Sequence, residues 1–315
     1  MFRSTPLFAL ILLFFSSTVD ASKKCLHVMS YHQGYAWNDG IEKGIENNLK
    51  GQCDLKKFYM DTKRNPSKAF AKSMADKAQH FIKEYQPDIV IASDDNASKY
   101  LVTRYKDSNI PFVFCGVNWT AKAYGFPYSN VTGMVEVAPV LPILRVIEDS
   151  VNVAKKGVYL SADVITEHKD FVHYKKLYAK RGVLLSAKFV KTMAEWVKAY
   201  STAQTADFII VNNNAGITGW DDAVAIKTVY NQSVKLTVTN YKWMMPFTMF
   251  AITKSAEEQG RWSAQVASEI LKGMDVADIP ITINKEWKMY INEKLLKKVN
   301  MKIESSIYKR ASTNW

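Results

Sequence analysis

Clusters of polar and aromatic residues directly follow three apolar segments in the first third of the chain. Carboxylates and amides in such clusters fix the orientation of a bound molecule, and aromatic rings stack on its flat or apolar faces. In an open parallel sheet, ligands bind outside the carboxyl ends of the strands, so clusters at three strand ends predict one binding pocket. The side chains concerned are Tyr31, His32 and Trp37 after residues 25–30, Asp94 and Asp95 after residues 88–92, and Asn118 and Trp119 after residues 110–115.

A second group of candidates follows later apolar segments and consists mainly of amides and aromatic residues. These side chains suit a polar or aromatic ligand. Structural alternatives exist, because asparagines are common in loops with unusual backbone angles and Asp94 also suits the first position of a helix. We expect further ligand contacts from Glu136, Asn212, Asn213, Asn214, Trp220 and Tyr241.

The candidates form no recognisable catalytic arrangement. Asp94 and Asp95 are adjacent, so their side chains point in different directions and make a poor acid–base pair. The sequence has no glycine-rich phosphate loop, no metal-ligand spacing and no nucleophile elbow. We therefore predict a site that holds a small molecule without catalytic residues, a metal or a cofactor, and an exported hydrolase is the competing enzyme hypothesis.

Two successive sets of alternating strand and helix patterns position these candidates. Apolar residues at helical spacing, such as Trp37, Ile41 and Ile45, separate the strand-like runs, and the same plan returns between residues 157 and 238. This alternation is typical of parallel sheets with helices on both faces. The 315-residue chain exceeds the usual domain size of about 100–150 residues, so we expect an α/β protein with two Rossmann-like lobes.

Residues 250–273 have the pattern of one long helix. Trp262, Val266 and Ile270 recur on one side of it, which predicts that this bulky face packs on the core.

Three cysteines constrain the fold further. Cys25 opens the first predicted strand and Cys53 immediately precedes the second, so parallel pairing of these strands places both cysteines at one edge of the sheet. Exported proteins meet an oxidising environment, and we predict a Cys25–Cys53 disulfide. Cys115 ends a strand and has no local His–Asp arrangement, so we expect a buried thiol with no nucleophilic role.

The N-terminal residues have the pattern of a secretory signal peptide. Arg3 precedes an apolar run at 7–15 that is too short to span a bilayer, and the small residue Ala21 suits a cleavage site. We expect cleavage after Ala21 and a periplasmic protein, with an uncleaved anchor as the alternative. The net charge of +12 comes from scattered lysines, which do not predict a nucleic-acid-binding patch.

Short motifs connect the chain to a known family. They are SYHQGYAW at 30–37, the strand ends at 93–97 and 113–118, and a late group at 258–260, 270–273 and 278–280. With these motifs the chain, over about residues 25–305, resembles the type 1 periplasmic binding-protein fold, and more narrowly the substrate-binding proteins of ABC transporters. The first motif is similar to an SYHxG signature of one branch, which also supplies sensor domains of bacterial histidine kinases.

The resemblance implies two lobes joined by a three-crossing hinge, with a ligand cleft between them that closes on the ligand. It implies a periplasmic solute-binding protein that captures a small polar or aromatic molecule and delivers it to an ABC permease. The candidate residues leave open whether that molecule is an amino acid, nucleobase-like or sugar-like. A free-standing sensor module that signals to a membrane histidine kinase is the alternative, and in either role we expect a monomer. The expected division is a 1–21 signal peptide, 22–134 plus 250–279 as lobe one, and 135–249 plus 280–315 as lobe two.

Overall fold

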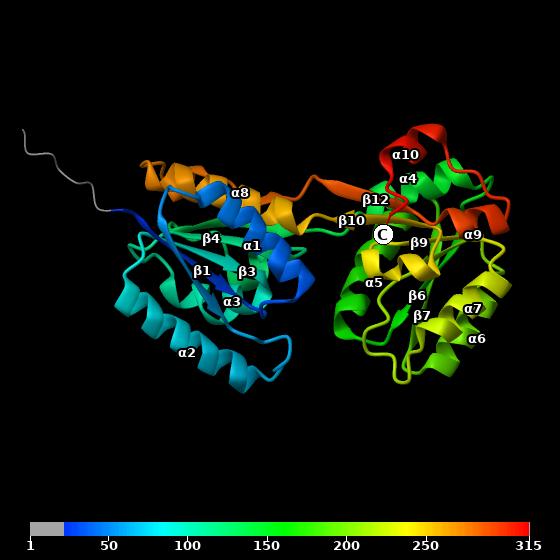
Figure 1. The fold of residues 1–315 in the computed structure, drawn as a ribbon, viewed down its shortest axis with the longest axis horizontal. Helices are drawn as coiled ribbons and strands as arrows, with labels where there is room; N and C mark the ends of the chain where they lie inside the picture. The colour runs from blue at the N-terminus through cyan, green and yellow to red at the C-terminus, as the bar shows by residue number, and fades with distance from the viewer. Residues whose placement is uncertain (1–21, 315) are drawn as a thin grey trace, which may run out of the picture.

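The protein consists of two lobes that lie side by side, each with its own sheet and covering helices (Figure 1). The computed structural model describes residues 22–314, so the signal peptide expected at 1–21 lies outside the described residues. No helix within 22–314 is both long and apolar enough to cross a bilayer. Two mostly parallel sheets flanked by helices confirm the predicted fold class.

The first lobe contains a six-stranded parallel sheet in the order β11-β5-β4-β3-β1-β2. Helices cover both faces of this sheet, which is why its central strands are continuous apolar runs in the sequence. The elements are β1 (Lys24–Met29), α1 (Ala36–Leu49), β2 (Asp54–Tyr59), α2 (Lys68–Tyr85), β3 (Ile89–Ser93), α3 (Asp94–Tyr100), η1 (Val102–Tyr105), β4 (Phe112–Asn118), η2 (Ala121–Tyr124), β5 (Val131–Glu136), α8 (Ala256–Leu271), η4 (Val276–Asp278) and β11 (Thr282–Ile283).

The second lobe repeats the plan with a sheet in the order β12-β10-β9-β8-β6-β7. Of its described strand pairs, β10–β12 is antiparallel and the others are parallel. The elements are α4 (Val140–Ser150), β6 (Lys156–Ala162), α5 (Ile165–Ala179), β7 (Leu184–Val190), α6 (Met193–Ala203), β8 (Phe208–Val211), α7 (Asp222–Gln232), β9 (Leu236–Thr239), η3 (Lys242–Phe247), β10 (Phe250–Lys254), β12 (Trp287–Ile291), α9 (Glu293–Lys298) and α10 (Ser305–Arg310).

The chain passes between the two lobes three times. It leaves lobe one after β5, returns between β10 and α8, and leaves again between β11 and β12. The last two crossings lie a few residues later than expected, because β10 extends the second sheet and β11 extends the first. Residues 250–254 therefore lie in lobe two and residues 282–283 in lobe one, the reverse of the expected division.

Helix α8 packs closely along α1, and Figure 1 shows the two helices side by side on one face of the first sheet. Glycines allow the close approach. A Cβ atom at Gly260 would lie 2.0 Å from the carbonyl oxygen of Ile41, and one at Gly44 would lie 2.5 Å from the carbonyl oxygen of Glu257. Side chains larger than hydrogen at these two positions would push the helices apart.

The long helix expected at 250–273 is shorter than predicted. Its first residues form β10, and α8 begins only at Ala256. The small residues Ala264 and Ala267 are fully buried, whereas Trp262 and Val266 are half-buried. Trp262, Val266 and Ile270 pack against the core as expected, and the close contact with α1 is made by the small face of the helix.

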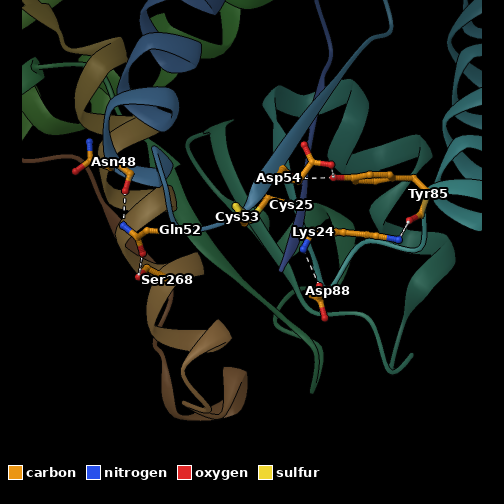
Figure 2. Close-up of a disulfide and its surroundings, with 9 residues drawn as sticks. All are labelled: Lys24, Cys25, Asn48, Gln52, Cys53, Asp54, Tyr85, Asp88 and Ser268. Atoms are coloured by element: carbon orange, nitrogen blue, oxygen red, sulfur yellow. Dashed lines mark hydrogen bonds between the residues drawn. A yellow bond between two sulfur atoms is a disulfide. The ribbon is translucent and has the colours of Figure 1, made fainter. Parts of the chain in front are cut away.

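The predicted disulfide joins Cys25 and Cys53, whose Cα atoms are 5.9 Å apart (Figure 2). The register of the parallel strands pairs Lys24 with Asp54 and so brings the two cysteines together. At the same edge of the sheet, the Tyr85 hydroxyl donates to the carbonyl oxygen of Asp54 at 2.5 Å. The crosslink therefore fastens the start of β1 to the start of β2.

Replacing both Cys25 and Cys53 with serine is expected to lower the free energy of unfolding by about 3 kcal/mol, because the crosslink restricts the unfolded chain. The closed loop spans a sequence separation of 28 residues. Urea denaturation with and without reductant measures the effect. Wild-type protein should lose the same stability when reduced, and the double variant should not respond to reductant. Equal midpoints for the oxidised wild type and the double variant would contradict the prediction.

Candidate functional site

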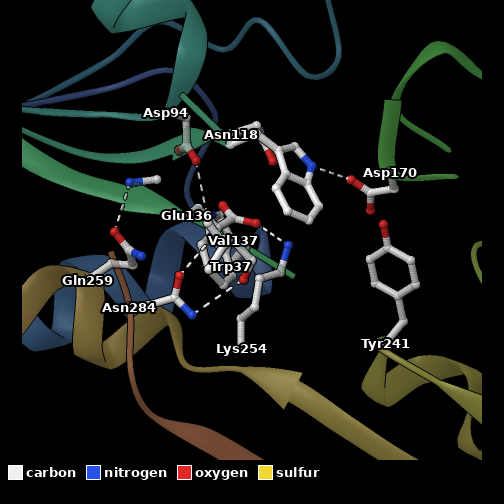
Figure 3. Close-up of polar contacts among 12 residues, drawn as sticks. Trp37, Asp94, Asn118, Glu136, Val137, Asp170, Tyr241, Lys254, Gln259 and Asn284 are labelled. Atoms are coloured by element: carbon white, nitrogen blue, oxygen red, sulfur yellow. Dashed lines mark hydrogen bonds and ion pairs between the residues drawn. The ribbon is translucent and has the colours of Figure 1, made fainter. Parts of the chain in front are cut away.

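Charged side chains at the ends of β3, β5 and β10 meet between the two lobes (Figure 3). Asp94 follows β3, Glu136 ends β5 and Lys254 ends β10. Trp37 joins them from α1 and Asp170 from α5 of the second lobe. We refer to these five residues as the interlobe cluster.

Asp94 is a buried carboxylate with one unsatisfied oxygen. The residue is only 2% exposed, and its Oδ1 accepts a hydrogen bond of 2.9 Å from the indole Nε1 of Trp37. Its Oδ2 has no hydrogen-bond partner among the described residues. Burial, followed by the nearby Glu136 carboxylate, raises the pKa of Asp94 well above its ordinary value.

The backbone around Asp94 is held in an uncommon conformation. Asp94 has a φ of 70°, and Trp119, at the end of the neighbouring strand, has a φ of 61°. Positive φ is uncommon for residues other than glycine and costs free energy at each position. Gly116 provides the space, since a Cβ atom there would lie 2.7 Å from Asp94 Oδ1. The backbone at this carboxylate therefore has an unfavourable conformational free energy, which the rest of the fold offsets.

Glu136 and Lys254 form an ion pair whose side chains are only 7% and 14% exposed. Burial raises the pKa of Glu136, although Lys254 opposes the shift. Burial alone would lower the pKa of Lys254, but the carboxylates of Glu136 and Asp170 outweigh it and the pKa is raised. The Lys254 ammonium also lies 5.6 Å from the centre of the Trp37 ring. Lys254 thus offsets the charges of Glu136 and Asp170.

Trp119 connects the two lobes directly. Its indole Nε1 donates to Asp170 Oδ1 at 2.7 Å, and its ring stacks on the His173 imidazole with the centroids 3.7 Å apart. Burial raises the pKa of Asp170 and lowers that of His173. A side chain from the end of β4 is therefore seated on α5 of the other lobe.

Tyr241 approaches the cluster from the second lobe, where Glu167 fixes its position. The Tyr241 hydroxyl donates to Glu167 Oε1 at 2.8 Å, and the hydroxyls of Tyr159 and Ser161 each donate to Oε2 at 2.8 Å. Three hydroxyl donors compensate for the complete burial of this carboxylate, whose pKa is raised by burial and by the nearby Asp170. Glu167 therefore orients Tyr241.

Asp95 and Asn118 bind each other on the first lobe. The Asn118 amide donates to Asp95 Oδ2 at 2.6 Å, and the Tyr124 hydroxyl donates to Asp95 Oδ1 at 2.5 Å. These contacts fix the end of β4 against α3, so Asp95 is more fully satisfied than Asp94.

Tyr31 and His32 lie in the loop before α1. The Tyr31 ring contacts Tyr35 edge-on at 5.3 Å, and burial followed by Asp94 raises the Tyr31 pKa well above its usual value. His32 Nδ1 is 2.9 Å from the Gln33 carbonyl oxygen. Tyr31 therefore lies close enough to Asp94 for the two side chains to interact electrostatically.

The asparagines after β8 are engaged within lobe two. Asn212 is fully buried and donates to the Tyr159 hydroxyl at 2.9 Å. Asn213 Oδ1 accepts from the Ala215 amide at 2.8 Å, while Asn214 is half-buried in the same turn. These contacts stabilise the turn and the neighbouring strands.

Trp220 also has its partners within lobe two. It packs edge-on against Trp196 and Phe247, with ring centroids 5.0 and 5.2 Å away, and its Nε1 donates to Asp222 at 2.6 Å. These contacts place its ring against the core of that lobe.

Lys254, Asp170 and Glu167 are functional candidates that the sequence reasoning missed. Lys254 ends an apolar strand, so the strand-end rule would have selected it if residues 250–254 had been recognised as β10. Asp170 and Glu167 lie within α5, and their sequence neighbourhood gives no signal for an interlobe position.

Comparisons with known proteins agree with this architecture. A family model described as ABC transporter substrate binding protein matches residues 24–314, without singling out the branch with the SYHxG signature. No curated protein matches the sequence.

Three solved structures share the fold, each at less than 20% sequence identity and over 92% of this chain. An open, ligand-free substrate binding protein with adhesive properties from Clostridium difficile has 18% identity, is covered over 98% of its length and gives a TM-score of 0.69. An ABC domain in complex with L-Trp from Streptococcus pneumonia has 19% identity, 99% coverage and a TM-score of 0.65. A conserved domain protein from Vibrio cholerae has 17% identity, 99% coverage and a TM-score of 0.64.

Proposed function

Because this chain belongs to the ABC transporter substrate-binding proteins, we propose that it captures one small polar or aromatic molecule between its lobes and delivers it to an ABC permease. One observation carries the proposal: buried polar groups from both lobes converge on the same interlobe cluster. Asp94 and Glu136 come from the first lobe, Asp170 comes from the second, and the residues are 2%, 6% and 8% exposed. Such convergence is typical of a ligand site that closes by hinge motion.

The ligand contacts that we propose come from rings and polar groups around this cluster. Aromatic rings supply apolar faces, and the fixed carboxylates and amide supply orientation. The complex of a structural relative with L-Trp supports a ligand with an aromatic part. The proposed contacts are Tyr31, Trp37, Asp94, Asp95, Asn118, Trp119, Glu136 and Tyr241.

The proposed place of action is outside the cytoplasm, after removal of residues 1–21. The disulfide supports an oxidising compartment. The family match favours delivery to a permease over the sensor alternative. The proposed role is to hold the ligand without transforming it.

Native mass spectrometry of protein purified without denaturation tests the proposal. We expect one bound small molecule. The protein is then unfolded to release this molecule and refolded without it. When the molecule is added back, small-angle scattering should show a decrease in the radius of gyration. Deletion of the gene should abolish uptake of the same molecule by the cells. Absence of any bound mass, together with no thermal shift across amino acids, amines, nucleosides and sugars, would contradict capture. Normal uptake after deletion would contradict delivery.

A further inference from the structure

The interlobe cluster has more carboxylates than cations. Asp94, Glu136 and Asp170 are all buried, and Lys254 is the one cation among the five residues of the cluster. Lys254 is paired with Glu136, whereas the indoles of Trp37 and Trp119 donate to Asp94 and Asp170. An indole N–H satisfies one oxygen and neutralises no charge, so ionisation of all three carboxyl groups would leave the cluster with more negative than positive charge.

Asp94 is the position in the cluster where a bound cation would act most directly, because burial favours the neutral form of its carboxyl group and the charge of Lys63 opposes that shift only in part. Its Oδ2 is buried and has no hydrogen-bond partner within residues 22–314, which is costly in a site shielded from water. Figure 3 shows its carboxylate directed toward Trp37 and Glu136, at the centre of the cluster. Asp94 has an uncommon positive φ of 70° at this position. A ligand that donates hydrogen bonds and carries positive charge would satisfy this oxygen.

The aromatic rings around the cluster already accept cations on their faces. Lys254 Nζ lies 5.6 Å from the Trp37 ring centre, and Lys63 Nζ lies 5.2 and 5.1 Å from the ring centres of Tyr31 and Tyr35. Ring faces attract organic cations through the same electrostatic effect. Rings beside carboxylates therefore favour an ammonium group on an apolar or aromatic body.

A carboxylate on the ligand finds an unfavourable environment in the same place. Lys254 is engaged by Glu136, and the first turn of α3 carries Asp94 and Asp95. Negatively charged side chains close to a bound anion repel it. An amino-acid ligand would thus gain from its ammonium group and lose from its carboxylate.

Building on the proposed capture function, we infer that the ligand is an organic amine without a carboxylate, and that its ammonium group binds Asp94 Oδ2 beside Trp37 and Glu136. The rest of the ligand contacts the surrounding rings. The site then selects by charge, preferring an amine over the amino acid of the same side chain.

Isothermal titration calorimetry with matched probes tests the inference on refolded, full-length mature protein. The pairs are tyramine and tyrosine, tryptamine and tryptophan, and cadaverine and lysine, with 3-(4-hydroxyphenyl)propionate as the anion. At least one amine should bind tenfold or more tightly than its amino acid, and the anion should not bind.

Each other result overturns the inference. An amino acid that binds as tightly as its amine would overturn it and leave the capture function standing. Failure of every amine to bind would also overturn it, and the mass-spectrometry experiment above would then decide separately whether any molecule is captured. A thermal shift produced by Ca²⁺ or Mg²⁺ alone, with no response to amines, would assign the negative charge to a metal ion.

The variant Asp94→Asn locates the binding group. Asparagine keeps the Oδ1 acceptor for Trp37 and tolerates positive φ, so the fold should be retained. We expect amine affinity to fall at least thirtyfold. The matched control Asp76→Asn removes a carboxylate that is 68% exposed and paired with Arg104 on the first lobe, and should bind normally. Unchanged amine affinity in Asp94→Asn, with wild-type thermal stability or better, would overturn the assignment.

Discussion

Replacing Lys254 with methionine is expected to lower the free energy of unfolding by about 3 to 5 kcal/mol at neutral pH, the usual cost of removing one partner of a buried ion pair. Methionine preserves much of the aliphatic volume of lysine but leaves Glu136 and Asp170 buried without a cation. Both carboxylates raise the pKa of Lys254, so both lose a stabilising neighbour. Chemical denaturation followed by circular dichroism measures the loss.

The loss should grow as the pH rises from acidic to neutral. In the variant, the Glu136 carboxyl has a pKa raised by burial and lacks the opposing Lys254, so the folded state binds the proton more tightly than the unfolded chain. The stability of the variant therefore falls as the pH rises from about 4.3, the pKa of a glutamate in the unfolded chain, through the higher pKa of Glu136 in the folded state. Wild-type Lys254 has a raised pKa, so its contribution is complete below about 10.4 and is lost only as pH rises through the folded pKa.

Two further variants distinguish this explanation from a general intolerance of substitution. Lys43→Met breaks an ion pair with Glu257 whose side chains are 65% and 39% exposed, and should cost less than about 1 kcal/mol. Adding Glu136→Gln to Lys254→Met should recover part of the lost stability, since it removes one uncompensated charge. The explanation is refuted if Lys254→Met is no more destabilising than Lys43→Met at neutral pH.

Replacing Gly260 with valine is expected to destabilise the first lobe by about 4 kcal/mol, among the largest effects for a single substitution. A Cβ atom at Gly260 would lie 2.0 Å from the carbonyl oxygen of Ile41, and backbone atoms cannot move aside as a flexible side chain does. The helices α1 and α8 must separate, which opens the core beneath them. Thermal denaturation and the yield of folded protein measure the effect.

The control for Gly260→Val lies on the same helix. Gln265 is exposed, so Gln265→Val introduces the same β-branched residue without a collision and should change stability by about 0.5 kcal/mol or less. Similar stabilities for the two variants would show that α1 and α8 tolerate a larger separation than their packing indicates.

The fold was largely predictable because its strands and helices have distinct local patterns. The disulfide could be predicted from two cysteines placed at the starts of successive strands. The errors arose at β10 and α8, where the prediction assigned 250–273 to one helix. Trp262 and its apolar neighbours pack on the core as predicted, but their spacing did not indicate that the small face, with Gly260, lies directly against α1. Sequence hydrophobicity does not report how closely two helices approach.

The candidate site was predictable only where the chemistry follows a strand end. Asp94 and Glu136 satisfy that rule and lie in the cluster. Asn212 satisfies it too, yet its amide is used by neighbouring strands, because buried amides bond to whatever polar group is nearest. Asp170 could not be found, since its position depends on which side of α5 faces the first lobe.

The contact of Trp119 with Asp170 and His173 separates affinity from selectivity. It joins one lobe of the protein to the other, so in the proposed closure it would contribute the same free energy around every ligand. Weakening it scales the dissociation constants of all ligands by one common factor and leaves their ranking unchanged. The ranking belongs to groups that touch the ligand itself, so substitutions of His173, which is not among the proposed ligand contacts, can tune how long a ligand is held without altering which ligand is chosen.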